Sequence, residues 1–348
     1  MSKRSTPQGV AAVLVALGVL VGLALPVPYV VLSPGPVIDV LGETSGKPLI
    51  TVTGATTDPT TGQLDLTTVN EAGGPHGRIP ITRVFGAWVD PATAVVPTGL
   101  LYPPGQTSQQ VQQESTEEML QSQDLAAVAA LRHQGIPVVL TVSVGDVRKG
   151  SPADGRLQVG DVFVTVDGTA VHTGAELRVA IQKHQPGETV RFVVRRAGQR
   201  VTVPVPTEPA GPGSKVAVVG VTPKDGYESP VTVTIRLEDV GGPSAGLMFT
   251  LGIIDMLTAV QENGGAHVAG TGTIDADGNV GAIGGVRQKM AGARDAGATI
   301  FLVPASNCAE ALMGVPAGLR LVKVTNVDDA LSGMAAAVAG RPAPTCTS

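Results

Sequence analysis

The sequence predicts a multidomain α+β protein that begins with a transmembrane helix. Three observations support this class: an uncharged apolar run near the N-terminus, an irregular mixture of strand and helix patterns, and junctions rich in proline and glycine. The chain has 348 residues, enough for two or three domains, and 43% of them are hydrophobic. Because only 3% are aromatic, we expect cores built from valine, alanine, leucine and isoleucine.

The apolar run covers residues 10–31 and follows Lys3 and Arg4. About 20 apolar residues span a bilayer as a helix, and basic flanking residues favour a cytoplasmic location for that end. We therefore expect a cytoplasmic N-terminus at residues 1–9, a single-pass anchor in the cell membrane at 10–31, and the bulk of the chain outside the cytoplasm. A cleaved signal peptide is the alternative, although no small-residue cleavage site follows Leu25.

Residues 32–124 predict a β-rich, membrane-proximal segment, with strand patterns at 49–52 and 64–69. A helical pattern starts at Ser115, which forms with Glu118 a sequence typical of a capping box. Residues of catalytic type do not cluster in this segment. We interpret it as a spacer that packs onto the domains that follow.

Residues 125–206 alternate strand and turn signals and contain three short motifs in order: GSPAD at 150–154, VGD at 159–161 and VDG at 166–168. This order resembles a PDZ domain, and such domains bind an extended peptide as an added strand. The family's carboxylate-binding loop should precede the first groove strand. That place holds residues 134–137, and Pro137 has no N–H to offer a carboxylate. A rigid docking or gating domain therefore stays open as the alternative.

Residues 207–214 are rich in proline and glycine and predict a linker. We expect a separate α+β domain at 215–340, with a nearly all-apolar helix at 243–260 and a second helix from Val286, and then a C-terminal tail at 341–348. Two cysteines, Cys308 and Cys346, are too few for a zinc site and would form a bridge only in an exported domain.

Ser244 lies in the sequence GGPSAG at residues 241–246, where it opens the apolar helix. Small flanking residues would let a substrate backbone approach. The N-terminus of a helix also provides free N–H groups and a partial positive charge, which stabilise an oxyanion. The structural alternative for Ser244 is an ordinary helix N-cap.

Lys289 follows 45 residues later, beside the apolar stripe of the helix that starts at Val286. Partial desolvation there would lower the lysine pKa, so that a neutral amine could accept the serine proton. A lysine with a buried stem and a solvated head is the alternative. The GxSxG pattern also fits α/β-hydrolases, but only His267 follows Ser244 and the remaining chain is too short for that architecture.

Together, these motifs resemble the proteolytic domain of Lon-type serine proteases over residues 214–340. The family's GPSAG falls at residues 242–246 and implies that Ser244 is the nucleophile. Its lysine motif falls at 283–289 and implies that Lys289 is the general base, and its TG pair falls at 271–272, so that Thr271 would orient the lysine. A plain strand role for Thr271 stays open. The chain departs from the family before Ser244, where Gly241 is an added residue.

The whole chain resembles anchored PDZ–Lon-like proteases, which lack an ATPase. The resemblance implies an ATP-independent serine endopeptidase with a Ser244–Lys289 dyad that cuts unfolded or exposed extracytoplasmic protein and peptide segments. It also leaves room for a ring-shaped homo-oligomer. We expect no cofactor and no metal, and the net charge of −5 without a basic patch argues against a nucleic-acid partner. A non-catalytic docking scaffold is the main alternative, and a self-cleaving pro-protein is a third.

Overall fold

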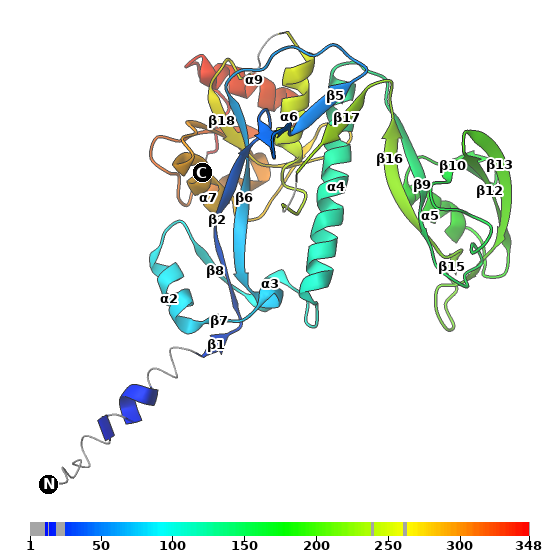
Figure 1. The fold of residues 1–348 in the computed structure, drawn as a ribbon, viewed down its shortest axis with the longest axis horizontal. Coiled ribbons are helices and arrows are strands. Elements are labelled where there is room, and N and C mark those ends of the chain that lie inside the picture. The colour runs from blue at the N-terminus through cyan, green and yellow to red at the C-terminus, as the bar shows by residue number, and fades with distance from the viewer. Residues whose placement is uncertain (1–10, 13, 19–24, 238–239, 260–262, 348) are drawn as a thin grey trace. The chain divides into compact units, whose positions relative to one another are not determined.

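The computed structural model describes residues 11–12, 14–18, 25–237, 240–259 and 263–347. The chain forms two compact units. The first unit combines Met1–His133 with Val233–Ser348, and the second unit is Gln134–Thr232 (Figure 1). The second unit is therefore an insertion in the chain of the first unit. The linker expected at residues 207–214 lies inside the second unit.

A six-stranded mixed sheet organises the first unit, in the order β22-β21-β18-β6-β2-β8. Its parallel part comprises β6 (Gln63–Gly73), β18 (His267–Gly270), β21 (Ile300–Pro304) and β22 (Arg320–Val324). Its antiparallel part adds β2 (Tyr29–Asp39) and β8 (Ala94–Pro97) beside β6. Strands from the N-terminal third thus complete the sheet of the C-terminal region.

Shorter strands pair two by two at the margins of the first unit. They are β1 (Pro26–Val27) with β7 (Ile79–Pro80), β3 (Glu43–Thr44) with β4 (Lys47–Pro48), β5 (Ile50–Thr53) with β17 (Thr232–Ile235), and β19 (Thr273–Ile274) with β20 (Val280–Gly281). The β19–β20 hairpin matters for the site because it begins two residues after Thr271.

Besides the helical residues 11–12 and 14–18, the described helices of the first unit are α2 (Ile81–Val89), α3 (Thr98–Leu101), α4 (Ser108–His133), α6 (Gly246–Leu257), α7 (Val286–Asp295), α8 (Cys308–Ala311) and α9 (Val327–Val338), with the short 3-10 turns η1 (Gly74–His76) and η2 (Ala305–Asn307). The apolar face of α7 packs into a core with Ala269, Phe301 and Val303 of the sheet. The same core contains the disulfide between Cys308 and Cys346, which the sequence had left open.

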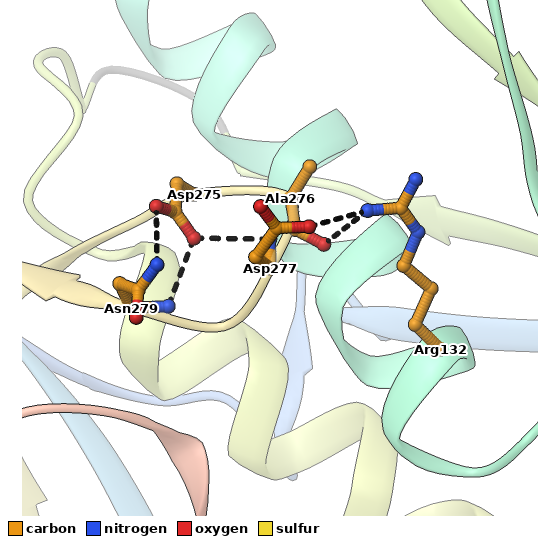
Figure 2. Close-up of polar contacts among 5 residues, drawn as sticks. All are labelled: Arg132, Asp275, Ala276, Asp277 and Asn279. Carbon is orange, nitrogen blue, oxygen red and sulfur yellow. Dashed lines mark hydrogen bonds and ion pairs between the residues drawn. The ribbon is translucent and has the colours of Figure 1, made fainter.

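The long helix α4 is attached at its C-terminal end to the β19–β20 hairpin (Figure 2). Arg132 donates to the carbonyl of Ala276 at 2.9 Å and pairs with the Asp277 carboxylate at 2.9 Å. Asp275 shapes this turn by accepting the backbone N–H groups of Asp277 and Asn279. Because the ion pair is exposed, it contributes little to stability, and its effect is to orient the end of α4.

The second unit is a twisted antiparallel sheet with one helix, in the order β13-β12-β10-β9-β16. Its main strands are β9 (Val139–Val147), β10 (Val162–Val166), β12 (Thr189–Arg196), β13 (Gln199–Pro206) and β16 (Val221–Glu228), with the short strands β11 (Thr169–Ala170), β14 (Glu208–Pro209) and β15 (Ala217–Val218). The helix is α5 (Gly174–Gln182), and its Leu177 and Ile181 enter the core beside Phe163 and Phe192.

The expected transmembrane helix at residues 10–31 is wrong. Within the part of the chain that the structure describes, no helix is both long enough and apolar enough to cross a membrane. The last residues of the expected span are strands β1 and β2, and Val30 and Val31 are buried in the sheet of the first unit. Pro26 and Pro28 disfavour a continued helix, and β-branched valines suit a strand. Residues 10, 13 and 19–24, like the cytoplasmic N-terminus expected at 1–9, lie outside the described residues.

Two further expectations change with that helix. The single-pass membrane location and the membrane partner both depended on the helix, so the same finding overturns the location and leaves the partner without support. The fold class is a mixed α/β multidomain architecture, since β6, β18, β21 and β22 run parallel and alternate with helices. The supposed membrane-proximal spacer supplies β2 and β6 to this sheet, with Leu64 and Leu66 fully buried.

Candidate active site and peptide groove

Ser244 lies in the loop just before α6, two residues ahead of the first helical residue. The cap residue of α6 is Ala245, and no side chain caps the helix. The Ser244 side chain is thus free of the N-cap role that the sequence allowed. The Ser244 carbonyl accepts the backbone N–H of Gly272 at 2.9 Å, which ties the loop to the segment after β18.

Lys289 projects from α7 to the Ser244 side chain, and its Nζ lies 2.8 Å from Ser244 Oγ. The side chain is buried, at 3% exposure, among the residues that α7 packs inward. Burial disfavours the charged ammonium and lowers the pKa of Lys289 to about 8. At that pKa, an appreciable fraction of the amine is neutral near physiological pH and can accept a proton.

Thr271 forms hydrogen bonds with both Ser244 and Lys289. Its Oγ1 accepts a hydrogen bond from Lys289 Nζ at 3.1 Å and donates to the carbonyl of Ser244 at 3.1 Å. Thr271 is fully buried directly after β18, and its two hydrogen bonds fix the direction of its hydroxyl. Three residues that are far apart in sequence therefore form one hydrogen-bonded set.

A cavity of about 610 Å³ opens beside this set and is lined by Ser244, Ala245 and Lys289. Its lining also includes β6, from Leu66 to Glu71, and the residues Ile283, Gly284 and Gly285. Among the described residues, the backbone N–H groups of Ser244 and Ala245 have no hydrogen-bond acceptor. They are candidates for holding a negatively charged oxygen in the cavity.

Beyond Leu66, the edge of the wall strand β6 that faces this cavity has no partner strand among the described residues. Its Gln63 N–H donates toward the β18 side, whereas Leu64 bonds toward β2, so alternate residues from Gln63 onward face β18. The pairing with β18 ends at Leu66, opposite Gly270. The N–H and C=O groups of Val69 therefore point beyond the end of β18, toward the cavity.

The second unit contains a groove of about 450 Å³ between α5 and residues 216–223. β16 is the edge strand of its sheet, and Leu177, Arg178 and Ile181 of α5 line the facing wall. Before β16, the backbone N–H groups of Val219 and Gly220 have no acceptor among the described residues, and Gly220 has a φ of 83°, which favours glycine. Adjacent backbone N–H groups of this kind are potential donors to an anion.

This loop and the β6 wall were missed by the sequence reasoning. The carboxylate-binding loop was sought ahead of the first strand of the second unit, at residues 134–137, whereas the N–H groups without a described acceptor lie at Val219 and Gly220, just before β16. The sequence Val-Gly-Val at 219–221, directly before a strand pattern, was a usable signal. Nothing local in β6 shows that it would lie beside Ser244, because their contact depends on pairing with β18, about 200 residues later in the chain.

Comparison with known proteins identifies both regions. Residues 110–207 match the PDZ domain family, and residues 239–336 match the Lon protease (S16) C-terminal proteolytic domain. The Lon protease of Xanthomonas oryzae is 34% identical over 116 residues, which are 32% of this chain and 11% of that protein. The Lon protease of Neorickettsia sennetsu is 34% identical over 95 residues, 26% of this chain and 11% of its own length. The chain thus spans only about a tenth of these relatives.

Solved structures also match. The PDZ domain of an SdrC-like protein from Listeria monocytogenes is 22% identical, with a TM-score of 0.22 over 23% of this chain and 84% of that one. A solution structure from Geobacillus thermodenitrificans is 27% identical, with a TM-score of 0.22 over 24% of this chain and 94% of that one. The two family matches establish the domain content: this chain contains a PDZ domain and a Lon protease C-terminal proteolytic domain.

Proposed function

We propose that the chain is a serine endopeptidase in which Ser244 is the nucleophile and Lys289 is the general base. One observation carries this proposal: a buried lysine, with its pKa lowered to about 8, lies 2.8 Å from a serine hydroxyl at the wall of a cavity. The Lon proteolytic domain independently supports a protease. A lysine with a purely structural role usually keeps its charged amine in solvent, whereas the Lys289 amine is buried beside a cavity.

The reaction follows from these contacts. Neutral Lys289 Nζ takes the Ser244 hydroxyl proton as Oγ forms a bond to the peptide carbonyl carbon. The carbonyl oxygen becomes an oxyanion and is held by the free N–H groups at Ser244 and Ala245. Protonated Lys289 then gives its proton to the leaving amine as the C–N bond breaks. Water attacks the acyl-enzyme with Lys289 again as base, and a carboxylate product leaves.

Substrate binding is proposed along the free edge of β6. An extended peptide would pair with the backbone of Val69 and continue past Ser244 as an added strand. Apolar side chains of Leu32 and Ile283, which line the same cavity and are partly exposed, suit apolar substrate residues. Since an added strand needs an extended backbone, the substrates would be unfolded or locally exposed protein segments.

The decisive experiment compares the full chain with its Ser244→Ala variant on an unfolded fluorogenic protein substrate. We expect cleavage by the wild type and none by the variant, with identical circular dichroism spectra for the two. Equal turnover by both proteins would exclude Ser244 as the nucleophile. A serine-directed covalent probe also tests the alternative of a docking scaffold, because a scaffold would leave Ser244 unlabelled.

Cleavage is further proposed to need no ATP, since the sequence contains no GxxxxGK[ST] phosphate loop. The same assay with and without Mg-ATP tests this directly. We expect equal rates with unfolded substrate, and a rate that depends on ATP would contradict the proposal. Assembly into a homo-oligomeric ring stays a prediction that sedimentation of the full chain can test.

The second unit is proposed to capture peptide C-termini in the groove beside α5. The N–H groups of Val219 and Gly220 would bind the terminal carboxylate, and the outer edge of β16 would pair with the peptide backbone. The observation that favours this role is the juxtaposition of free N–H groups, an unpaired strand edge and an apolar helix wall. Pro223 offers no N–H, so the added ladder would be short.

A further inference from the structure

The loop that carries Ser244 lies against the helix α4. The Gly242 N–H donates to the carbonyl of Ser115 at 2.9 Å, and Ser122 Oγ donates to the carbonyl of Pro243 at 3.0 Å. Ser115 and Ser122 are seven residues apart, which is two helical turns, so they lie on the same face of α4. The helix therefore holds the loop at two successive residues just before Ser244.

Close packing reinforces both contacts. A Cβ at Gly241 would collide with Ser115 Oγ, and a Cβ at Gly246 would lie 3.0 Å from Ser122 Oγ. The sequence marked Gly241 as an added residue relative to the Lon pattern. In the structure, Ser115 packs on Gly241. The 241–244 loop can lie against α4 because Gly241 has no side chain.

The Ser122 contact has a direct chemical consequence. The Pro243 carbonyl and the Ser244 N–H belong to one planar peptide unit, in which the C=O and N–H bonds point in opposite directions. A hydrogen bond that holds the carbonyl toward α4 therefore turns the Ser244 N–H away from α4. That N–H is one of the two proposed oxyanion donors. Ser122 is 3% exposed, so its hydroxyl has no competing solvent.

We propose that Ser122 is a positioning residue that aims the Ser244 N–H at the oxyanion, with Ser115 as a second support of the loop. This inference rests on the proposed peptidase function. Its expected signature is selective, because a misdirected oxyanion donor weakens the transition state and leaves substrate binding intact.

The test uses the full chain with Ser122→Ala, Ser122→Thr and Thr250→Val. Thr250 is a matched control, since its buried hydroxyl also lies at the α4–α6 contact, 2.9 Å from the Gly246 carbonyl oxygen and 3.4 Å from that of Ala126, but does not touch the 241–244 loop. We expect Ser122→Ala to lower kcat about tenfold to a hundredfold with KM within twofold, and Ser122→Thr to restore most of kcat. A peptide boronate, which forms a tetrahedral adduct with serine, should lose affinity in the same proportion.

Two outcomes would overturn the proposal. One is a kcat within twofold of wild type for Ser122→Ala, and the other is an equal loss of kcat for Thr250→Val, which would indicate general loosening of the helix contact. Failure of the parent function is separate, because it would appear as wild-type turnover that Ser244→Ala does not remove.

A second pair of variants covers the case in which Ser122→Ala fails to fold. Gly241→Ala should push the loop away from Ser115 and lower kcat, and Ser115→Gly in the same chain should recover it by removing the colliding Cβ and Oγ. Loss of kcat in Gly241→Ala without recovery in the double variant would count against support of the loop by α4.

Discussion

The cavity beside Ser244 and the groove beside α5 both combine polar groups with apolar walls, but they draw on different chemistry. The Ser244 cavity adds buried side chains to its backbone N–H groups and strand edge, and its lysine and threonine are 3% and 0% exposed. The α5 groove offers backbone N–H groups and a strand edge without a buried ionisable side chain, and its two charged wall residues, Arg148 and Arg178, are exposed. Burial changes the proton affinity of Lys289, whereas the groove must leave its donors accessible to a partner. The comparison teaches that the first region is suited to moving protons and the second to binding.

The largest expected effect comes from removing the buried amine with Lys289→Met. Peptide cleavage should fall at least a thousandfold, because the serine loses its base. The folded protein should become more stable at pH 7. A lysine pKa lowered from 10.5 to about 8 corresponds to a cost of about 3 kcal/mol for the charged form in the native state.

The sign of that stability change can be checked against pH. Between about pH 8 and 10.5, the unfolded chain binds more protons at this lysine than the folded chain, so wild-type stability rises with pH across the window. The advantage of Lys289→Met in urea unfolding should be complete below pH 8 and disappear by about pH 10.5. A destabilised variant with retained cleavage would show that Lys289 is structural.

The pH dependence of cleavage gives the next largest effect. The reaction needs neutral Lys289, so kcat/KM should rise about tenfold per pH unit below the pKa of about 8 and level off above it. The measurement is initial rate against pH on a short peptide without ionisable side chains. The Kd of a peptide for the α5 groove should not change with a midpoint near pH 8. If the Kd and the cleavage rate did share that midpoint, the distinction between the two regions would be lost.

Thr271→Val should give a smaller effect. The valine keeps the shape but removes the acceptor for Lys289 Nζ and the donor to the Ser244 carbonyl. We expect kcat to fall about tenfold and the pH midpoint to move to a lower value, since the ammonium loses a hydrogen bond that favours it. Thr207→Val is the matched control, because Thr207 has a buried hydroxyl in the second unit with two carbonyl partners. Equal losses of kcat in both variants would leave Thr271 without a specific role.

Local patterns in the sequence were enough to predict the helices that flank the candidate site. The helix expected from Val286 corresponds to α7, and the apolar helix expected at 243–260 contains α6. The resemblance to the Lon proteolytic domain pointed to Ser244, Thr271 and Lys289, which do lie within hydrogen-bond distance of one another, while their catalytic roles stay predictions. Helical periodicity and short motifs are local patterns, so they can be recognised in a single sequence.

Features that depend on distant pairing could not be read in this way. The parallel register of Leu64 with Val268 joins segments about 200 residues apart, and neither segment specifies its partner. The same limitation explains the error at residues 26–31. An apolar run rich in valine fits a membrane helix or a buried strand equally well, and only the neighbouring β6 and β8 decide between them.

The smallest expected effect concerns the α5 groove and tests whether the two regions act separately. Arg178→Glu places a negative charge where a peptide carboxylate would approach Val219 and Gly220. In the Ser244→Ala background, calorimetry with a peptide that ends in an apolar residue should show a Kd increased about threefold to tenfold, and amidation of the peptide terminus should remove this difference. Arg200→Glu on β13, at the opposite edge of the sheet, makes the same change in net charge and should leave Kd unaltered.

Cleavage of short peptides should be unchanged by Arg178→Glu when Ser244 is present. An amidated peptide terminus lacks the negative charge that Arg178 attracts. If peptides with a free carboxylate and with an amidated terminus bind equally well, carboxylate recognition is refuted, even if the groove still holds the peptide backbone.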